Sequence, residues 1–91
     1  MIPKTILLSK IARKQLDSLP EDTRNKVKKA LYSINDPEKS KILDTKKLKG
    51  VRGGEDLFRL RIGNYRVVYF EDVDSFKIIQ IFHRGKGYKW L

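Results

Sequence analysis

Three arginines stand close together in the second half of the chain, at Arg59, Arg61 and Arg66, each flanked by apolar residues. A guanidinium group is planar, permanently charged and rich in hydrogen-bond donors, so it suits phosphate oxygens and the spread charge of a phosphoryl transition state. A single exposed arginine is ordinary on a solvated surface, but a cluster calls for a partner. The spacing therefore indicates a phosphate-binding surface.

Two further basic groups accompany glycine or aromatic residues. The first is a set of cations in a glycine-rich segment, namely Lys46, Lys47, Lys49 and Arg52. It lacks the spacing of a P-loop, so a solvated loop is an equal interpretation. The second mixes rings with positive charge at the end of the sequence: His83, Arg84, Lys86, Tyr88, Lys89 and Trp90. Rings among cations can stack on unpaired bases, although Tyr88 and Trp90 could instead cover the edge of the core. The lysines of both groups and Arg52 are candidates for RNA binding.

Composition restricts the partners and the compartment. The 91 residues include 21 Lys and Arg against 11 Asp and Glu, a formal net charge of +10, which favours RNA, DNA or an acidic protein as the partner. With one histidine and no cysteine, we expect no metal site, no cofactor and no disulfide. Apolar runs of at most four residues predict no membrane span, and the lack of a leader pattern favours a cytoplasmic protein.

The first half of the chain predicts a strand followed by two helices. The segment from Pro3 to Leu8 becomes apolar toward its end, and Ser9 then offers a hydroxyl that can cap a helix. A break at Pro20 separates this helix from a second one, whose apolar residues recur three and four positions apart. The second helix should end at Asn35-Asp36-Pro37, because the residue before a proline is driven out of helical geometry. The two helices should form a hairpin.

The arginines fall in a predicted β-hairpin. Leu57–Ile62 and Tyr65–Phe70 alternate around Gly63-Asn64, a pair suited to a two-residue turn with positive φ angles. This register places Arg61 opposite Arg66 and gathers one apolar face for packing on the helices: Phe58, Leu60, Ile62, Tyr65, Val67 and Tyr69. The arginines share the other face. Like charges across strands repel, and the hairpin holds no acid, so an external anion is the simplest compensation.

A last strand is predicted over Phe76–His83. One residue of slip in the turn before it would exchange its two faces, so the pattern leaves open whether His83 or Arg84 joins the arginines. Together these elements predict a single α+β domain over residues 1–91. It consists of an N-terminal strand, a two-helix hairpin and an antiparallel β-meander, in a sheet of about four strands.

Several of these segments resemble the RelE/ParE superfamily of toxins from type II toxin-antitoxin systems, and an archaeal RelE in particular. They are the Leu-Pro helix hairpin, Lys47-Leu48-Lys49-Gly50, the arginine hairpin and the ending His83-Arg84-Gly85-Lys86-Gly87-Tyr88. The likeness runs nearly end to end, and the block Arg59 to Tyr69 is its most specific part. The helices would fit many proteins.

The resemblance implies a RelE-like fold and a ribosome-dependent endoribonuclease that inhibits translation by cleaving mRNA in the A site, as in a stress response. In that family the 2′-hydroxyl attacks the adjacent phosphate without a metal, and a cognate RelB-like antitoxin, expected to be acidic, neutralises the toxin in a heteromeric complex. By motif position, the catalytic residues carried over are Arg59, Arg61, Arg66, Arg84 and Tyr88.

The chain departs from better-known RelE toxins, which carry lysines at the positions of Arg59 and Arg61. A guanidinium with a pKa above about 12 cannot act as a general base at neutral pH. The base is therefore open between His83, Tyr88 and Lys86. Two other functions also remain open: a ParE-type toxin that poisons DNA gyrase, and a non-catalytic domain that binds RNA or the ribosome through its basic surface.

Overall fold

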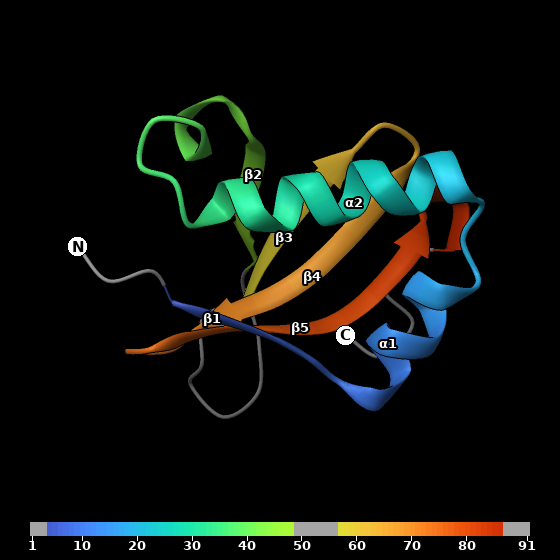
Figure 1. Ribbon diagram of the computed structural model, residues 1–91, viewed down its shortest axis with the longest axis horizontal. Helices are drawn as coiled ribbons and strands as arrows, with labels where there is room; N and C mark the ends of the chain where they lie inside the picture. Colours follow the sequence, from blue (N-terminus) through green and yellow to red (C-terminus); the bar gives the residue numbers. More distant parts are fainter. Residues whose placement is uncertain (1–3, 49–56, 87–91) are drawn as a thin grey trace.

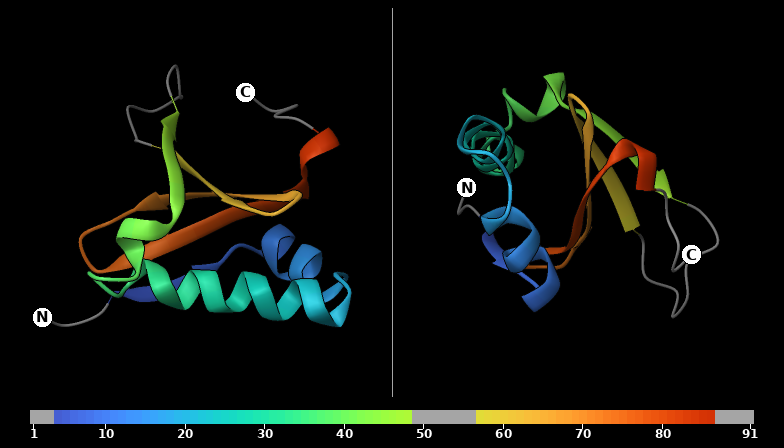
Figure 2. Two further views of the ribbon diagram at one scale, coloured as in Figure 1. Left: turned by 90° about the horizontal axis from the view of Figure 1, so that it is seen from above. Right: turned by 90° about the vertical axis from the view of Figure 1, so that its right-hand side faces the viewer.

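The computed structural model describes residues 4–48 and 57–86. Its elements in chain order are strand β1 (Thr5–Leu8), helices α1 (Lys10–Asp17) and α2 (Glu21–Ile34), the short 3₁₀ helix η1 (Ser40–Ile42), strands β2 (Asp44–Leu48), β3 (Leu57–Ile62), β4 (Tyr65–Glu71) and β5 (Ser75–His83), and the 3₁₀ helix η3 (Arg84–Lys86). Both α-helices cover the same face of one twisted sheet (Figures 1 and 2). The predicted RelE-like α+β fold is confirmed.

The sheet has five strands in the order β1-β5-β4-β3-β2, rather than the expected four or so. The central strands form the predicted antiparallel meander, whereas β1 lies parallel to β5. The additional strand is β2, which pairs antiparallel with β3 at the sheet edge. Four of its five residues are exposed, so it lacks the apolar alternation by which strands are recognised, and part of the lysine-rich segment interpreted as a loop belongs to it.

The helices begin and end where the sequence predicts. Ser9 caps α1, its hydroxyl accepting a hydrogen bond from the Ala12 N–H at 3.0 Å. Pro20 stands at the N-cap of α2, and Glu21 and Asp22 lie in its first turn, near the positive end of the helix dipole. Neither α-helix in ranges 4–48 and 57–86 is long and apolar enough to cross a membrane.

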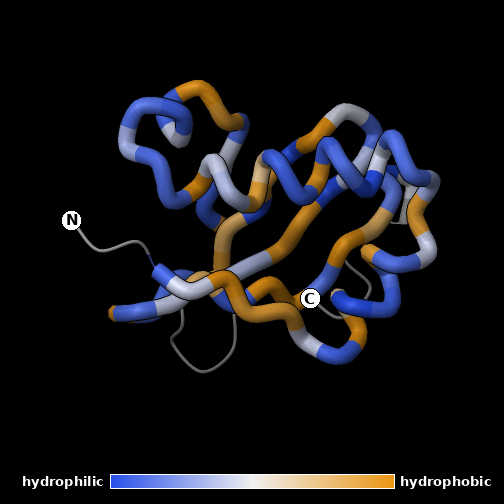
Figure 3. The backbone as a smooth tube through the Cα atoms, viewed as in Figure 1, coloured by the Kyte–Doolittle hydropathy of each residue, from blue (hydrophilic) through white to orange (hydrophobic). Residues whose placement is uncertain are grey.

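The main core lies between the helices and the sheet. It contains the fully buried Leu60 and Val67 of the predicted apolar face, with Phe58 and Ile62 packed against it, so that prediction is confirmed. Tyr65 of the same face contacts the ring of His83 instead. Figure 3 shows apolar residues along the central strands and polar residues on the outer turns of α2.

Helix α1 continues the edge hydrogen bonding of β5 beyond the end of β1. The Ser9 N–H donates to the Ile78 carbonyl at 2.8 Å, and the Ser9 hydroxyl to the Ile79 carbonyl at 2.7 Å. The side-chain oxygen of Gln15 accepts from the Ile81 N–H at 2.6 Å. These bonds fall beside a register irregularity between β4 and β5, and they fix the last part of β5, which leads to His83.

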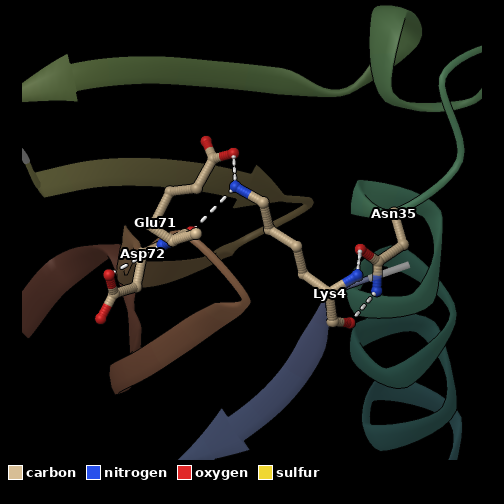
Figure 4. A network of polar contacts seen from close by, with 5 residues as sticks. Lys4, Asn35, Glu71 and Asp72 are labelled. Carbon is tan, nitrogen blue, oxygen red and sulfur yellow. Dashed lines mark hydrogen bonds and ion pairs between the residues drawn. The ribbon is translucent and has the colours of Figure 1, made fainter. Parts of the chain in front are cut away.

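A polar network joins the start of β1 to two distant parts of the chain (Figure 4). The Lys4 N–H donates to the side-chain oxygen of Asn35 at 2.9 Å, and the Asn35 amide returns a bond of 2.7 Å to the Lys4 carbonyl. The Lys4 ammonium pairs with Glu71 and donates to the Asp72 carbonyl at 2.9 Å. The end of α2, the start of β1 and the β4–β5 turn are thereby held together.

Candidate functional site

The predicted register of the arginine hairpin is confirmed. Arg61 lies directly opposite Arg66 and Ile62 opposite Tyr65, around a turn in which Gly63 alone has a positive φ, of 57°. A positive φ at only the first central residue is the property of a II′ turn. Arg59, Arg61 and Arg66 therefore share the sheet face opposite to the helices.

The arginines have an internal counter-ion that the sequence analysis missed. Asp44 of the edge strand β2 pairs with Arg61 in the ladder, and its two carboxylate oxygens contact two guanidinium groups. One oxygen lies 3.3 Å from Nη2 of Arg59, and the other 3.0 Å from Nε of Arg61. The simplest compensation expected from the sequence was an external anion, but an acid of the neighbouring strand β2 already offsets the opposed arginines.

Arg59 and Arg61 differ sharply in exposure. The side chain of Arg59 is 16% exposed, whereas that of Arg61 is 55% exposed. The Nε atom of Arg59 is buried and has no hydrogen-bond partner within residues 4–48 and 57–86. Leaving a buried donor of this kind unpaired costs about 1–3 kcal/mol. Arg59 is therefore an enclosed cation, and the Asp44 carboxylate is its charge partner. Arg61 is the more open of the two.

Arg66 is folded back onto the hairpin turn. Its Nη1 atom donates to the carbonyl oxygens of Gly63 at 3.2 Å and Tyr65 at 3.1 Å. These bonds orient the guanidinium at the end of the sheet. The same turn also receives the chain after β5, because the Arg84 N–H donates to the Asn64 carbonyl at 2.8 Å.

The end of β5 separates two residues that the sequence could not assign to a face. His83 is opposite Tyr65, and their rings meet edge to face with centroids 5.4 Å apart, so His83 lies on the helix side of the sheet and not with the arginines. Its Nδ1 atom accepts from the Gly85 N–H at 3.3 Å. Arg84 is exposed at the start of η3, beside the hairpin turn.

The predicted RNA-binding cations do not all gather together. Lys46 is opposite Arg59 and shares the arginine face, whereas Lys47 is opposite Phe58 and belongs to the other face. The backbone of Lys86 lies in η3. The predictions for Lys49, Arg52, Tyr88 and Lys89 fall outside the described residues.

The arginine face also carries an apolar cluster. Leu57, Val68 and Phe82 are buried there on β3, β4 and β5, and neighbouring apolar residues pack against them. The strand alternation of Val68 and Phe82 would have indicated this cluster once the β5 register was known. Only a predicted pairing of Asp44-Thr45-Lys46 with β3 would have revealed Asp44.

No group of three or more potential metal-ligating side chains occurs in the described part of the chain.

Comparisons with known proteins identify the class. A family model described as "ParE toxin of type II toxin-antitoxin system, parDE" matches residues 6–88. The chain therefore belongs to the RelE/ParE superfamily of toxins from type II toxin-antitoxin systems, as its resemblance predicted. Among curated proteins no relative matches the sequence significantly.

Solved structures of three toxin-antitoxin complexes have the same fold. The chain is 27% identical to a chain of the archaeal RelE–RelB complex from Pyrococcus horikoshii, with a TM-score of 0.76, covering 94% of this chain and 100% of that one. It is 26% identical to a chain of the RelB–RelE complex from Methanococcus jannaschii, with a TM-score of 0.70 and coverage of 88% and 92%. It is also 26% identical to a chain of the RelBE2 complex from Mycobacterium tuberculosis, with a TM-score of 0.71 and coverage of 91% and 100%.

Proposed function

We propose that this toxin is a ribosome-dependent endoribonuclease, an mRNA interferase that cleaves mRNA in the ribosomal A site and so inhibits translation. The observation that carries the proposal is the opposed pair Arg61 and Arg66 on the sheet face left free by the helices. Two guanidinium groups side by side suit a phosphodiester that gains charge in its transition state. Arg84 adds a third cation at the same hairpin turn.

The proposed reaction needs no metal ion. The mRNA 2′-oxygen bonds to the adjacent phosphorus as the bond from phosphorus to the 5′-oxygen breaks, giving a 2′,3′-cyclic phosphate and a 5′-hydroxyl. A base takes the 2′-hydroxyl proton, and the 5′-oxygen receives one. Arg61 and Arg66 would hold the non-bridging oxygens and stabilise their charge, while the ribosome keeps the mRNA in line for attack.

The base stays open among His83, Tyr88 and Lys86. The hydrogen bond from the Gly85 N–H to Nδ1 of His83 means that a neutral ring carries its proton on Nε2. In that tautomer neither ring nitrogen is free to accept the 2′-hydroxyl proton. His83 can therefore act as the base only if the bond from Gly85 to Nδ1 is released when mRNA binds.

The proposed physiological partner is an acidic, RelB-like antitoxin that neutralises the toxin. Support comes from the three similar toxins named above, each solved in complex with its antitoxin. The charge of +10 makes association with a negative chain fast and favourable.

The second candidate is poisoning of DNA gyrase without RNA cleavage. It is favoured by the description of the matching family model, which is a ParE toxin. A third reading, a basic module that binds RNA or ribosomes without cutting, requires only the charged surface.

One experiment separates these functions. Purified protein is added to translating ribosomes, and the 5′ ends of the mRNA are mapped, while gyrase-linked DNA breaks are scored in parallel. Cuts in phase with codons are the expected result. Gyrase-linked breaks without mRNA cleavage would assign the protein to the second candidate, and ribosome binding with neither product would leave the third.

A further inference from the structure

Asp44 connects two arginines of unequal exposure. Its Oδ1 atom lies 3.3 Å from Nη2 of the enclosed Arg59, and its Oδ2 atom 3.0 Å from Nε of the open Arg61. The three residues come from adjacent strands β2 and β3, in a ladder that places Asp44 directly opposite Arg61. An enclosed arginine thus fixes a carboxylate, and the carboxylate fixes an open arginine.

The contact with Arg61 engages Nε and leaves the two terminal Nη atoms unbonded within residues 4–48 and 57–86. Terminal guanidinium nitrogens are the donors that form paired bonds to phosphate oxygens. A carboxylate bound at Nε therefore orients this side chain without occupying the donors that a phosphate needs.

Without Asp44, the opposed Arg66 would repel Arg61 across the ladder. Arg66 is itself restrained by two carbonyl bonds at the turn, so Arg61 would be the side chain that moves away. Because long cationic side chains lose rotamer entropy when they are fixed, a free Arg61 would lose that entropy on the way to the transition state, whereas an Arg61 already held by Asp44 would not.

We propose that Asp44 is a positioning residue, which holds Arg61 in the orientation that receives the scissile phosphate, with Arg59 as its anchor. The choice of mRNA phosphate as the ligand rests on the function proposed above. Asp44 touches neither the phosphate nor the reacting atoms; it acts through Arg61.

Two effects of removing the charge of Asp44 can be told apart: the change in net charge should strengthen RNA binding, whereas the loss of Arg61 positioning should slow cleavage. Asp44→Asn makes the protein one unit more positive, which by long-range electrostatics alone should tighten RNA binding. If Asp44 positions Arg61, the same change should slow cleavage, because a displacement of about 1 Å in a positioned group can cost up to ~10²-fold in rate.

The test compares Asp44→Asn with Asp17→Asn, which makes the same charge change at an exposed pair with Arg13 on α1. With translating ribosomes as substrate, Asp44→Asn should lower kcat by about 10-fold or more without raising KM. Asp17→Asn should cleave like wild type. Asp44→Glu, which keeps the charge, should recover part of the rate. An Asp44→Asn protein that melts normally and retains wild-type kcat would overturn the proposal.

A second measurement keeps this result separate from the fate of the proposed function. NMR spectra of the arginine Nε–H groups are recorded while inorganic phosphate is added. In wild type the Arg61 signal should shift saturably, and in Asp44→Asn it should start elsewhere and respond weakly. This pattern in a protein that cuts no mRNA would retain the positioning role and reject the ribonuclease. Identical Arg61 signals in both proteins would reject the positioning role, whatever the protein cleaves.

Discussion

Arg61 and Arg66 are directly opposed across β3 and β4, yet their guanidinium groups are held by different partners. Arg61 binds the Asp44 carboxylate, and Arg66 binds the carbonyls of Gly63 and Tyr65. Each of the two opposed cations is therefore held by partners of its own, Arg61 by the neighbouring strand β2 and Arg66 by the hairpin turn. Such an arrangement maintains a local positive field that a phosphate can enter without first reorganising the site.

Removing Arg66 should abolish mRNA cleavage and leave the fold intact. Arg66→Ala deletes one of the two opposed cations, and the loss of transition-state stabilisation should lower the rate by at least ~10²-fold. Its bonds go to carbonyls of an exposed turn that water can satisfy, so the melting temperature should change little. Cleavage of ribosomal mRNA by purified variants, with Arg13→Ala on α1 as the control, measures this effect. Wild-type cleavage by Arg66→Ala would remove Arg66 from the site.

The hairpin was predictable because its information is local. Gly63 fixes the turn, the turn fixes the register, and the register places Arg59, Arg61 and Arg66 on one face. Asp44 was not predictable in the same way. It reaches the site through β2, an exposed edge strand whose pairing depends on β3 and not on any pattern of its own.

The position of His83 escaped prediction for a related reason. A register irregularity between β4 and β5 reverses the alternation of faces partway along β5. Counting residues from the β4–β5 turn to His83 therefore assigns His83 to the wrong face. Hydrogen bonds that join β5 to Ser9 and Gln15 lie on either side of this irregularity, and these two residues are the N-cap of α1 and a residue of its last turn. Long-range contacts, which one sequence does not reveal, therefore decided what lies beside the arginines.

Gln15 should contribute measurably to stability through β5. Gln15→Met keeps the length of the side chain but removes the acceptor of the Ile81 N–H, and an unpaired backbone donor costs about 1–3 kcal/mol. Chemical denaturation followed by circular dichroism measures the loss. Asn25→Met on the exposed side of α2 is the control and should stay within about 0.5 kcal/mol of wild type. Equal stabilities for the two variants would mean that the Gln15 bond is replaced by water.

Tyr69 should make the fold sensitive to high pH. Burial in the core and, to a smaller extent, the charge of Glu71 raise the pKa of Tyr69 from 10.0 to about 12. Because the folded pKa exceeds the unfolded one, this contribution to stability is complete below pH 10 and is lost as the pH rises toward 12. The free energy of unfolding, plotted against pH, should therefore fall more steeply across this range for wild type than for Tyr69→Phe. Parallel curves would show that Tyr69 ionises equally in both states.

The proposed antitoxin should stabilise the toxin as well as silence it. A charge of +10 on 91 residues attracts an acidic chain, and a segment that folds on binding can cover a large part of so small a surface. Exposed apolar residues, including Ile42 and Val73, would contribute to such a contact. A ligand that binds only the native state, present at 100 times its Kd, raises the free energy of unfolding by about 2.7 kcal/mol, enough to raise Tm by roughly 10 °C or more in a domain of this size.

The test is a set of thermal melts of the toxin with the protein product of its co-expressed neighbouring gene. An unrelated acidic, disordered peptide of equal charge is the control. The cognate chain should raise Tm and block cleavage, and the control peptide should do neither at physiological salt. A basic neighbour, or an acidic one that binds without changing Tm or cleavage, would contradict this account of neutralisation.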